Sequence, residues 1–284
     1  MREPYYEEKG IKLYLGDNNE IMKEMYEEGI RFDTIFADPP YFLSTKDGIT
    51  FINGKVTVCD KGDWDQKIPF EEQMTFHKLW LNNCLLLMKD HSSIWISGTY
   101  HNIFKIGYIV QEKGLKVLND VIWYKCNASP NITCRFLTHS HETLLWIKQN
   151  NDVPHIFNYK IAKAWSDERD ILKERGKQMR DVWSIYIVPG AEKEIGSHPT
   201  QKPIDLLVRL LMISIKFSHS ILDPFNGGGT SAIACRLLGV DYSGIDIDEE
   251  CLELTIKKLK DVKYRRSALI DRYVSFAVSK PNRL

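Results

Sequence analysis

Apolar residues along the chain follow two alternating patterns, short continuous runs and runs with helical spacing. The segment 11–15 is a short apolar run, and within 18–28 the residues Ile21, Met22 and Met25 recur at helical spacing. Asp17, between the two, is placed either to cap the helix or to line a site at the strand's carboxyl end. Further strands are predicted at 32–37, 92–97, 117–124, 143–148, 220–223 and 238–246, and further helices at 70–88, 101–113, 206–215, 231–238 and 249–264.

Alternation of strands and helices predicts an α/β fold with a mostly parallel sheet. The strands 117–124 and 143–148 are an exception, because the segment between them has no helical period and a parallel pair needs a long crossover. We therefore expect these two strands to pair antiparallel. With 284 residues, the chain is expected to form a single domain, 1–284, that carries insertions.

The apolar run at 34–37 stops at the sequence Asp38-Pro39-Pro40-Tyr41. The run has the length and the β-branched and aromatic content of a strand buried on both faces. Two consecutive prolines lack N–H donors and fix φ, so a stiff exposed turn is predicted here. A carboxylate, a free backbone carbonyl and an aromatic ring together suit the exocyclic amine of a nucleobase. An ordinary strand-to-loop turn is the alternative.

A second group of residues follows the strand predicted at 220–223. The sequence Asp223-Pro224-Phe225-Asn226-Gly227-Gly228-Gly229-Thr230 leads into a helix, and the next strand ends at Asp246. Glycines there permit close backbone approach, and an acid at the end of the following strand is typical of a site that binds the ribose of an adenosine cofactor. The G-x-G-x-x-G spacing of dinucleotide sites and the G-K-[ST] of phosphate loops are both absent. These absences favour S-adenosylmethionine over NAD and ATP.

Two polar segments interrupt the pattern. The segment 42–67 contains Asp60, Asp63 and Asp65, and a loop of this length is usually functional, so we interpret it as a mobile lid over the site. Metal binding by these aspartates is the alternative, but their spacing is not that of a calcium loop. The segment 149–197 is rich in charge and is predicted to be an inserted target-recognition segment that reads nucleic acid.

The charged part of this segment, and a polar segment that precedes it, can each be explained without a role in binding nucleic acid. An exposed charged helix at 162–175 accounts for much of the composition of the insert. The segment 123–131, which contains Trp123, Lys125 and Asn127, could frame a flipped base or grip phosphate, or could form a solvated loop.

Composition narrows the functional classes. Formal net charge is zero and the pI is about 7.1, so the protein is no general polyanion binder and contact with nucleic acid needs a local basic surface. The six cysteines include no C-x-x-C pair, which argues for reduced thiols and against zinc. The chain has no apolar signal region and no run of the ~18 apolar residues that a membrane helix needs. We therefore expect a cytoplasmic protein with no membrane and no metal.

Three motifs, in this order, resemble those of one enzyme family. Asp38-Pro-Pro-Tyr41 comes first, followed by His198-Pro-Thr-Gln-Lys-Pro203 and then Phe225-Asn-Gly-Gly-Gly-Thr230. The order is similar to that of β-class amino-methylating DNA methyltransferases of the DPPY type, in which the catalytic half precedes the cofactor half. The segments 36–44, 61–65, 95–98 and 176–183 resemble the second adenine-N6 methyltransferase of GATC-specific restriction–modification systems. Where the family commonly has Gly-Ser-Gly, this chain has Gly227-Gly228-Gly229, and we expect that change to modulate cofactor binding.

This resemblance implies a Rossmann-like S-adenosylmethionine-dependent methyltransferase fold with a circularly permuted motif order. It implies a site-specific DNA methyltransferase that moves a methyl group from S-adenosylmethionine to N6 of a flipped-out adenine, as the modification component of a restriction–modification system. Cytosine-N4 methylation is the nearest alternative; RNA methylation, a catalytically silent nucleic-acid-binding regulator and a Rossmann-type dehydrogenase are the others. The implied partner is double-stranded DNA, with single-stranded DNA as a second form. The resemblance leaves open whether the protein forms a homodimer, which sequence it recognises and whether it has a cognate restriction enzyme.

The resemblance also assigns roles to individual residues, and it assigns no metal ligands. Asp38, Pro39, Pro40 and Tyr41 are catalytic: Asp38 and the Pro39 carbonyl accept the two N–H bonds of the amine, and Tyr41 stacks on the base. Cofactor contacts are implied for Asp17, Thr200, Gln201, Lys202, Pro203, Asp223, Pro224, Phe225, Asn226, Gly227, Gly229, Thr230 and Asp246.

Overall fold

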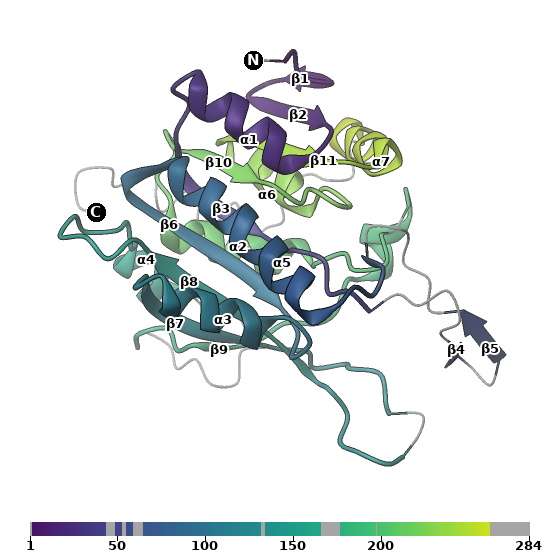
Figure 1. Ribbon diagram of the computed structural model, residues 1–284. Coiled ribbons are helices and arrows are strands. Elements are labelled where there is room, and N and C mark those ends of the chain that lie inside the picture. The colour runs from purple at the N-terminus through teal and green to yellow at the C-terminus, as the bar shows by residue number, and fades with distance from the viewer. Residues whose placement is uncertain are drawn as a thin grey trace.

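The architecture is a twisted sheet with helices on both faces, as a computed structural model describes it for residues 2–43, 49–52, 55–58, 65–131, 134–165, 177–196 and 198–261 (Figure 1). Within those residues a nine-stranded sheet has the order β1-β2-β11-β10-β3-β6-β8-β7-β9, and β4 and β5 form a separate ribbon. The strands are β1 (Tyr6–Glu8), β2 (Ile11–Leu15), β3 (Phe32–Ala37), β4 (Ile49–Ile52), β5 (Lys55–Val58), β6 (Met88–Gly98), β7 (Lys116–Tyr124), β8 (His141–Lys148), β9 (Val182–Ser184), β10 (Ser220–Asp223) and β11 (Asp241–Asp246). The helices are α1 (Asn18–Glu27), α2 (Phe70–Leu86), α3 (Ile103–Glu112), α4 (Tyr159–Ala164), α5 (Ile204–Ser214), α6 (Thr230–Leu238) and α7 (Glu249–Lys260), with a short 3₁₀ turn at Gly190–Lys193.

The sheet is mostly parallel, as the alternation of elements predicts. The central strands β2, β11, β10, β3 and β6 all pair parallel. The strand β8 pairs antiparallel with β6 on one side and with β7 on the other. The pairing of β7 with β8 confirms the antiparallel pair expected for the segments 117–124 and 143–148. The sheet order places the C-terminal strands β10 and β11 between the N-terminal strands β2 and β3.

Two apolar layers cover the central strands, which are buried along most of their length. All six residues of β3 are buried, as expected for a strand with helices on both faces. One layer packs α1, α2 and α3 against the sheet, and the other packs α4, α5, α6 and α7 against its opposite face (Figure 1). Among the described residues, no helix has the length and apolar character that crossing a bilayer requires.

The segment predicted as an insert at 149–197 is partly built into the main fold. Val182–Ser184 forms β9 and pairs parallel with β7 at the edge of the sheet. Trp165 and Trp183 are buried, and the guanidinium carbon of Arg209 lies 5.5 and 4.5 Å from the centres of their rings. These two tryptophans therefore stabilise the core, whereas residues 166–176, most of the charged helix expected at 162–175, lie outside the described residues.

The structure also differs from the sequence prediction in the segment 42–67 and at the end of the last helix. The segment 42–67 is not a loop throughout, because β4 and β5 pair as an antiparallel ribbon; Asp60 and Asp63 lie outside the described residues. The last helix ends at Lys260, and residues 262–264 of its predicted range lie outside the described residues.

Candidate active site

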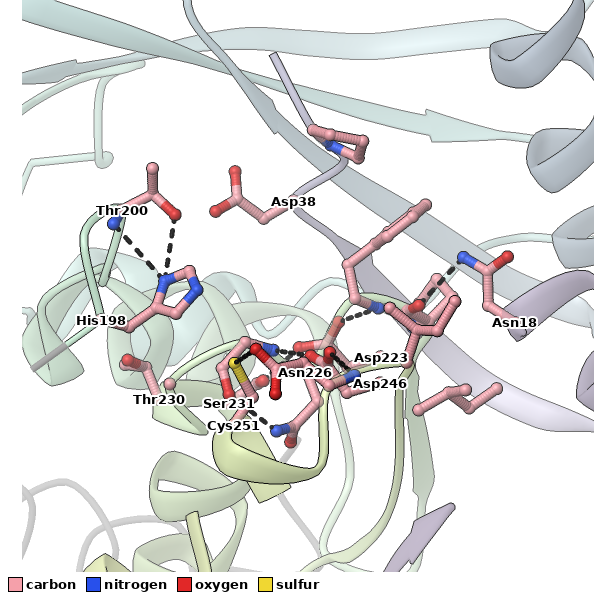
Figure 2. A pocket seen from close by; sticks show the side chains of 18 of the residues that line it. Asn18, Asp38, His198, Thr200, Asp223, Asn226, Thr230, Ser231, Asp246 and Cys251 are labelled. Carbon is pink, nitrogen blue, oxygen red and sulfur yellow. Dashed lines mark hydrogen bonds between the residues drawn. The ribbon is translucent and has the colours of Figure 1, made fainter. Parts of the chain in front are cut away.

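A cavity of about 750 Å³ lies at the carboxyl ends of β2, β3, β10 and β11, where parallel strands bring their C-terminal residues to one edge. Asp17 follows β2, Asp38 follows β3, and Asp223 and Asp246 end β10 and β11. Figure 2 shows the side chains of Asp38, Asp223 and Asp246 around this one cavity. Residues assigned to two separate motifs in the sequence thus meet in one place.

Most of the expected cofactor residues line this cavity. They are Asp17, Thr200, Gln201, Lys202, Asp223, Pro224, Phe225, Asn226, Gly227, Thr230 and Asp246. Pro203 and Gly229, which the resemblance also implied, do not line it. Pro203 is the N-terminal flanking residue of α5, where its fixed φ suits the helix start. Gly228, which was not assigned, does line the cavity.

Asp223 and Asp246 are held by the glycine turn that joins β10 to α6. Asp223 accepts a hydrogen bond from the backbone N–H of Phe225 at 2.9 Å and another from the hydroxyl of Ser231. Asp246 accepts from the N–H of Gly227 at 2.6 Å. Burial raises the pKa of Asp223 to about 7 and that of Asp246 to about 6. Both carboxyl groups are therefore poised to gain from a cationic ligand.

Two glycines of this turn are also required by the packing of the protein on itself. Gly229 has φ of +75° and precedes α6, and a Cβ there would lie 2.3 Å from the hydroxyl of Thr255 in α7. A Cβ on Gly228 would lie 2.8 Å from Cβ of His198. Neither close neighbour is a ligand, so these two positions need glycine whether or not a cofactor is bound.

Asp17 fulfils both of the roles considered for it. Its carboxylate accepts from the N–H groups of Asn19 and Glu20 at 2.8 and 3.1 Å, so it caps α1, and it also lines the cavity. The next residue, Asn18, donates to the carbonyl of Pro224 at 3.1 Å and ties this cap to the glycine turn. Sequence reasoning missed Asn18, although its position beside Asp17 was a usable signal.

The Asp38 turn contacts the rest of the protein through Tyr41 and Lys202. Tyr41 donates from its hydroxyl to one oxygen of Asp38 at 2.8 Å. Lys202 donates to the other oxygen at 2.5 Å and to the hydroxyl of Tyr41 at 2.9 Å. The ring of Tyr41 is only 6% exposed and does not line the cavity. In this conformation Tyr41 positions Asp38, and its ring is not the open stacking face that the resemblance implied.

Asp65 clamps the same turn from the far end of the 42–67 segment. Its carboxylate accepts from the backbone N–H groups of Tyr41, Phe42 and Leu43 at 2.8, 2.7 and 3.2 Å. Phe42 has φ of +56°, which is unfavourable for a bulky residue and persists only where the surroundings hold it. Asp65, considered above for a metal, thus holds a strained turn beside Asp38.

A carboxylate that the sequence did not single out lies behind Lys202. Glu142, the second residue of β8, is 3.5 Å from the ammonium of Lys202 and 2.6 Å from that of Lys125. Burial alone would lower the pKa of Lys202, but Asp38 and Glu142 together hold it well above its ordinary value. Lys202 is therefore a buried cation between two carboxylates.

The 123–131 segment does not frame this cavity. The indole N–H of Trp123 donates to the carbonyl of Ile185 at 2.8 Å, and Lys125 pairs with Glu142. The side chain of Asn127 accepts from the N–H of Ile187 at 2.9 Å. These three side chains hold β7, β8 and the chain after β9 together, and none of them lines the cavity.

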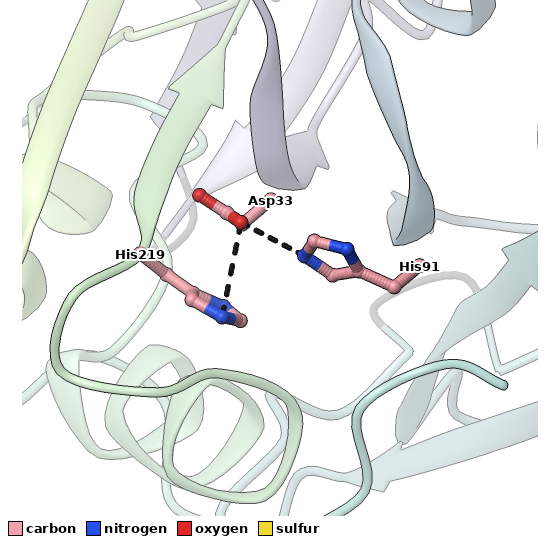
Figure 3. A group of neighbouring side chains, drawn as sticks. All are labelled: Asp33, His91 and His219. Carbon is pink, nitrogen blue, oxygen red and sulfur yellow. Dashed lines mark hydrogen bonds and ion pairs between the residues drawn. The ribbon is translucent and has the colours of Figure 1, made fainter.

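A second group of titratable side chains lies at the opposite ends of the strands (Figure 3). One oxygen of Asp33 faces Nε2 of His91 at 2.9 Å and Nε2 of His219 at 3.7 Å. Its other oxygen accepts from Lys89 at 2.7 Å and from the N–H and hydroxyl of Ser220. Although burial opposes it, these donors lower the pKa of Asp33 to about 2. The carboxylate already has its cation in Lys89, so this group is an ion-pair cluster that joins the starts of β3, β6 and β10.

Comparisons with known proteins agree with the geometry. Residues 32–258 match the family model N6_N4_Mtase, described as DNA methylase. The chain is 40% identical over 260 residues to the type II methyltransferase M2.LlaDCHI of Lactococcus lactis subsp. cremoris, covering 91% of this chain and 93% of that protein. It is 40% identical over 261 residues to the type II methyltransferase M2.DpnII of Streptococcus pneumoniae, covering 92% and 93%.

A solved structure shares the fold. The crystal structure of the M1.HpyAVI–SAM complex superposes with a TM-score of 0.65 and 24% identity, over 88% of this chain and all of that one. The α/β fold with a mostly parallel sheet is thus the methyltransferase fold that the motif order implied. Since the family model spans both the Asp38 turn and the glycine turn, and relatives match over nearly their whole length, the chain belongs to the N6_N4_Mtase family of DNA methylases.

Proposed function

We propose that the protein transfers a methyl group from S-adenosylmethionine to N6 of an adenine in DNA. The observation that carries the proposal is the position of Asp38 on the wall of the cavity that Asp223 and Asp246 also line. A hydrogen-bond acceptor for an amine and acceptors for an adenosine cofactor thus share one cavity.

The chemistry of the cavity fits S-adenosylmethionine. Its volume of about 750 Å³ lies in the range of small-molecule sites. Among the described residues, neither Asp223 nor Asp246 has an ion-pair partner, and both have raised pKa values. A ligand with a sulfonium and an amino group supplies cationic partners, and its ribose hydroxyls supply donors. Phosphate groups are stabilised by N–H donors or cations, and next to Asp223 and Asp246 they would be repelled by like charge. This repulsion disfavours NAD and ATP as the cofactor.

S-adenosylmethionine would supply the electrophilic methyl group, so the chain has to prepare the amine. The N6 lone pair of adenine is delocalised into the ring, which makes the amine a poor nucleophile. Asp38 and the carbonyl of Pro39 are the acceptors we assign to its N–H bonds. Accepting them favours the pyramidal nitrogen of the transition state over the planar ground state. Asp65 and Tyr41 hold that turn in place before the base arrives.

Several finer assignments belong to the same proposal. An acid at position 38, where serine would be the other expectation in this family, supports adenine over the exocyclic N4 of cytosine. We infer double-stranded DNA as substrate, with single strands as a second form to be tested, and a role as the cytoplasmic modification enzyme of a restriction–modification system. The segments 42–67 and 149–197 are proposed to cover the site and to read the target. Any homodimer is open to measurement of molecular mass in solution.

The proposal is tested by methylating DNA with a labelled cofactor. The purified protein is incubated with duplex and single-stranded DNA of varied sequence, and the products are digested to nucleosides. We expect the label in N6-methyladenine, and sequencing of the methylated DNA gives the recognition site. Label in N4-methylcytosine would overturn the adenine assignment. If calorimetry shows that cofactor binds but neither base is labelled in any DNA, transfer to DNA is wrong.

A further inference from the structure

Four charged side chains form a continuous chain beside the cavity. Lys125 pairs with Glu142 at 2.6 Å, Glu142 lies 3.5 Å from Lys202, and Lys202 pairs with Asp38 at 2.5 Å. Their side chains are 20, 9, 5 and 14% exposed, respectively. Ion pairs that are this buried respond strongly when one partner is removed, because the other is left as an uncompensated charge.

In this state the ammonium of Lys202 holds an oxygen of Asp38, the acceptor that the proposed function assigns to the substrate amine. One oxygen of Asp38 accepts from Tyr41 and the other accepts from Lys202. An incoming N6 amine competes with these donors for an oxygen of Asp38, and Lys202 is the donor that has a second carboxylate, Glu142, within 3.5 Å. A buried ammonium cannot simply withdraw, since an unpaired charge in a dry site is costly.

Glu142 offers Lys202 another partner. Oε1 of Glu142 is taken by Lys125. Oε2 is fully buried, faces Lys202 and has no hydrogen-bond partner among the described residues. A buried carboxylate oxygen normally has a donor, so this unfilled acceptor beside a lysine calls for a reason.

We propose that Glu142 is a positioning residue that accepts the Lys202 ammonium when the substrate amine takes the place of that ammonium at Asp38. The inference rests on the proposed function and identifies what clears the acceptor for the amine. Lys202 stays charged and paired throughout, because the two carboxylates hold its pKa well above the ordinary value. It only exchanges one carboxylate for another across a short gap.

The exchange also suits the charge that develops during transfer. The bond from the methyl carbon to N6 would form as the carbon–sulfur bond of the sulfonium breaks. The electron pair of that bond stays on sulfur, which becomes a neutral thioether, and the positive charge passes to N6 until a proton leaves N6 for water. Asp38 paired with Lys202 alone would present no net charge to that nitrogen. With Glu142 as counter-ion to Lys202, the carboxylate of Asp38 faces the cationic nitrogen with its own charge uncompensated.

The first test measures single-turnover methyl transfer with saturating cofactor. Glu142→Gln keeps the shape of the side chain and removes its charge. We expect the rate to fall about tenfold or more, while calorimetric cofactor affinity stays the same. Glu142→Asp, which keeps the charge, should recover part of the rate. Glu112→Gln is the matched control, because Glu112 pairs with Lys78 at 2.7 Å on the surface, and it should leave the rate unchanged.

A double-mutant cycle separates action through Lys202 from a merely structural role. In a Lys202→Met background, Glu142→Gln should change the rate less than twofold, because the residue through which it acts is gone. Multiplicative, independent effects of the two substitutions would overturn the inference, as would a wild-type rate for Glu142→Gln.

A binding measurement covers the case in which the Lys202→Met variants are too slow to assay. The affinity for target DNA is compared with that for the same DNA carrying purine, which lacks the amine, in place of adenine. We expect the preference for adenine over purine to shrink in Glu142→Gln, since the lysine is then harder to displace. An unchanged preference would contradict the inference. Absence of methyl transfer by the wild-type protein would instead contradict the proposed function, so the two failures are distinct.

Discussion

Asp38 and Asp223 show how the surroundings of a single carboxylate decide its role. Asp38 is paired with a buried ammonium and a phenol, which orient both oxygens. Asp223 is more deeply buried and accepts only from neutral donors, a backbone N–H and a hydroxyl. The proposed function uses this difference: the first carboxylate accepts from the substrate amine, and the second gains from a cationic ligand.

At the residue scale, Asp38→Ala should abolish methyl transfer. Removing an acceptor used in the transition state lowers the rate constant by a factor of about 1000 or more, and cofactor affinity should be preserved because Asp223 and Asp246 are untouched. Transfer assays and calorimetry on the same preparation measure the two quantities. Turnover close to wild type would refute the role assigned to Asp38.

The raised pKa of Asp223 predicts that cofactor binding depends on pH. Below a pH of about 7 the carboxyl group of the free protein is protonated, and it must lose that proton to pair with a cationic ligand. Affinity should therefore fall as pH falls from 7.5 to 6, by roughly tenfold at most. Calorimetry at several pH values measures this slope. In Asp223→Asn the slope should shrink to the smaller contribution of Asp246, whose pKa is raised to about 6, and an unchanged slope would assign the effect to another group.

At the scale of elements, the turns that follow β3 and β10 line the cavity, and each is fixed by contacts to other parts of the chain. The glycine turn packs on Thr255 of α7 and is tied to Asn18 of α1. The Asp38 turn is clamped by Asp65. A turn held in this way is preorganised for its ligand, so little ordering is needed on binding.

Gly229 and Gly239 allow the contribution of one such contact to be isolated. Both have positive φ, +75° and +69°, and flank the two ends of α6, but only Gly229 has a close neighbour, Thr255. Gly239→Ala should lower the free energy of unfolding by about 1 kcal/mol through backbone strain alone. Gly229→Ala should lower it by about 3 kcal/mol, because α7 must also shift. Urea unfolding of both variants measures this difference, and equal losses would contradict the packing role.

At the scale of the whole molecule, the residues at the two ends of the parallel strands have different roles. The carboxyl ends of β2, β3, β10 and β11 surround the cavity. At the other end of β3 and β10, the Asp33 cluster joins three strands. Stability and chemistry can thus be changed independently.

Asp33→Ala should therefore destabilise the protein and leave the site intact. Removing the carboxylate leaves Lys89 and the N–H of Ser220 without an acceptor, at a cost of about 3 kcal/mol. Because the pKa of Asp33 is lowered to about 2, its contribution is present above about pH 4 and disappears as pH falls through 2. Thermal unfolding should show the loss at pH 7, with Glu112→Gln as a surface control that changes little. A matching loss of cofactor affinity at a temperature where the variant is folded would contradict the separation.

The sequence alone determined the features that local chemistry controls. Apolar periodicity predicts the strands and helices around the site, and fixed proline φ predicts the stiff turn at Asp38. The glycine turn and Asp246 were recognisable because a strand end, a helix start and an acid follow one another within a short stretch of chain.

Only the tertiary structure decided which distant residues complete the site. Asp65 reaches the Asp38 turn from 22 to 24 positions away, and Lys202 reaches Asp38 from 164 positions away. No local pattern marks Glu142 as the partner of Lys202, or Thr255 as the reason for Gly229. Such contacts depend on the spatial order of the strands in the sheet. In that order the last two strands, β10 and β11, lie between β2 and β3. That order is set by packing over the whole chain, and no single segment encodes it.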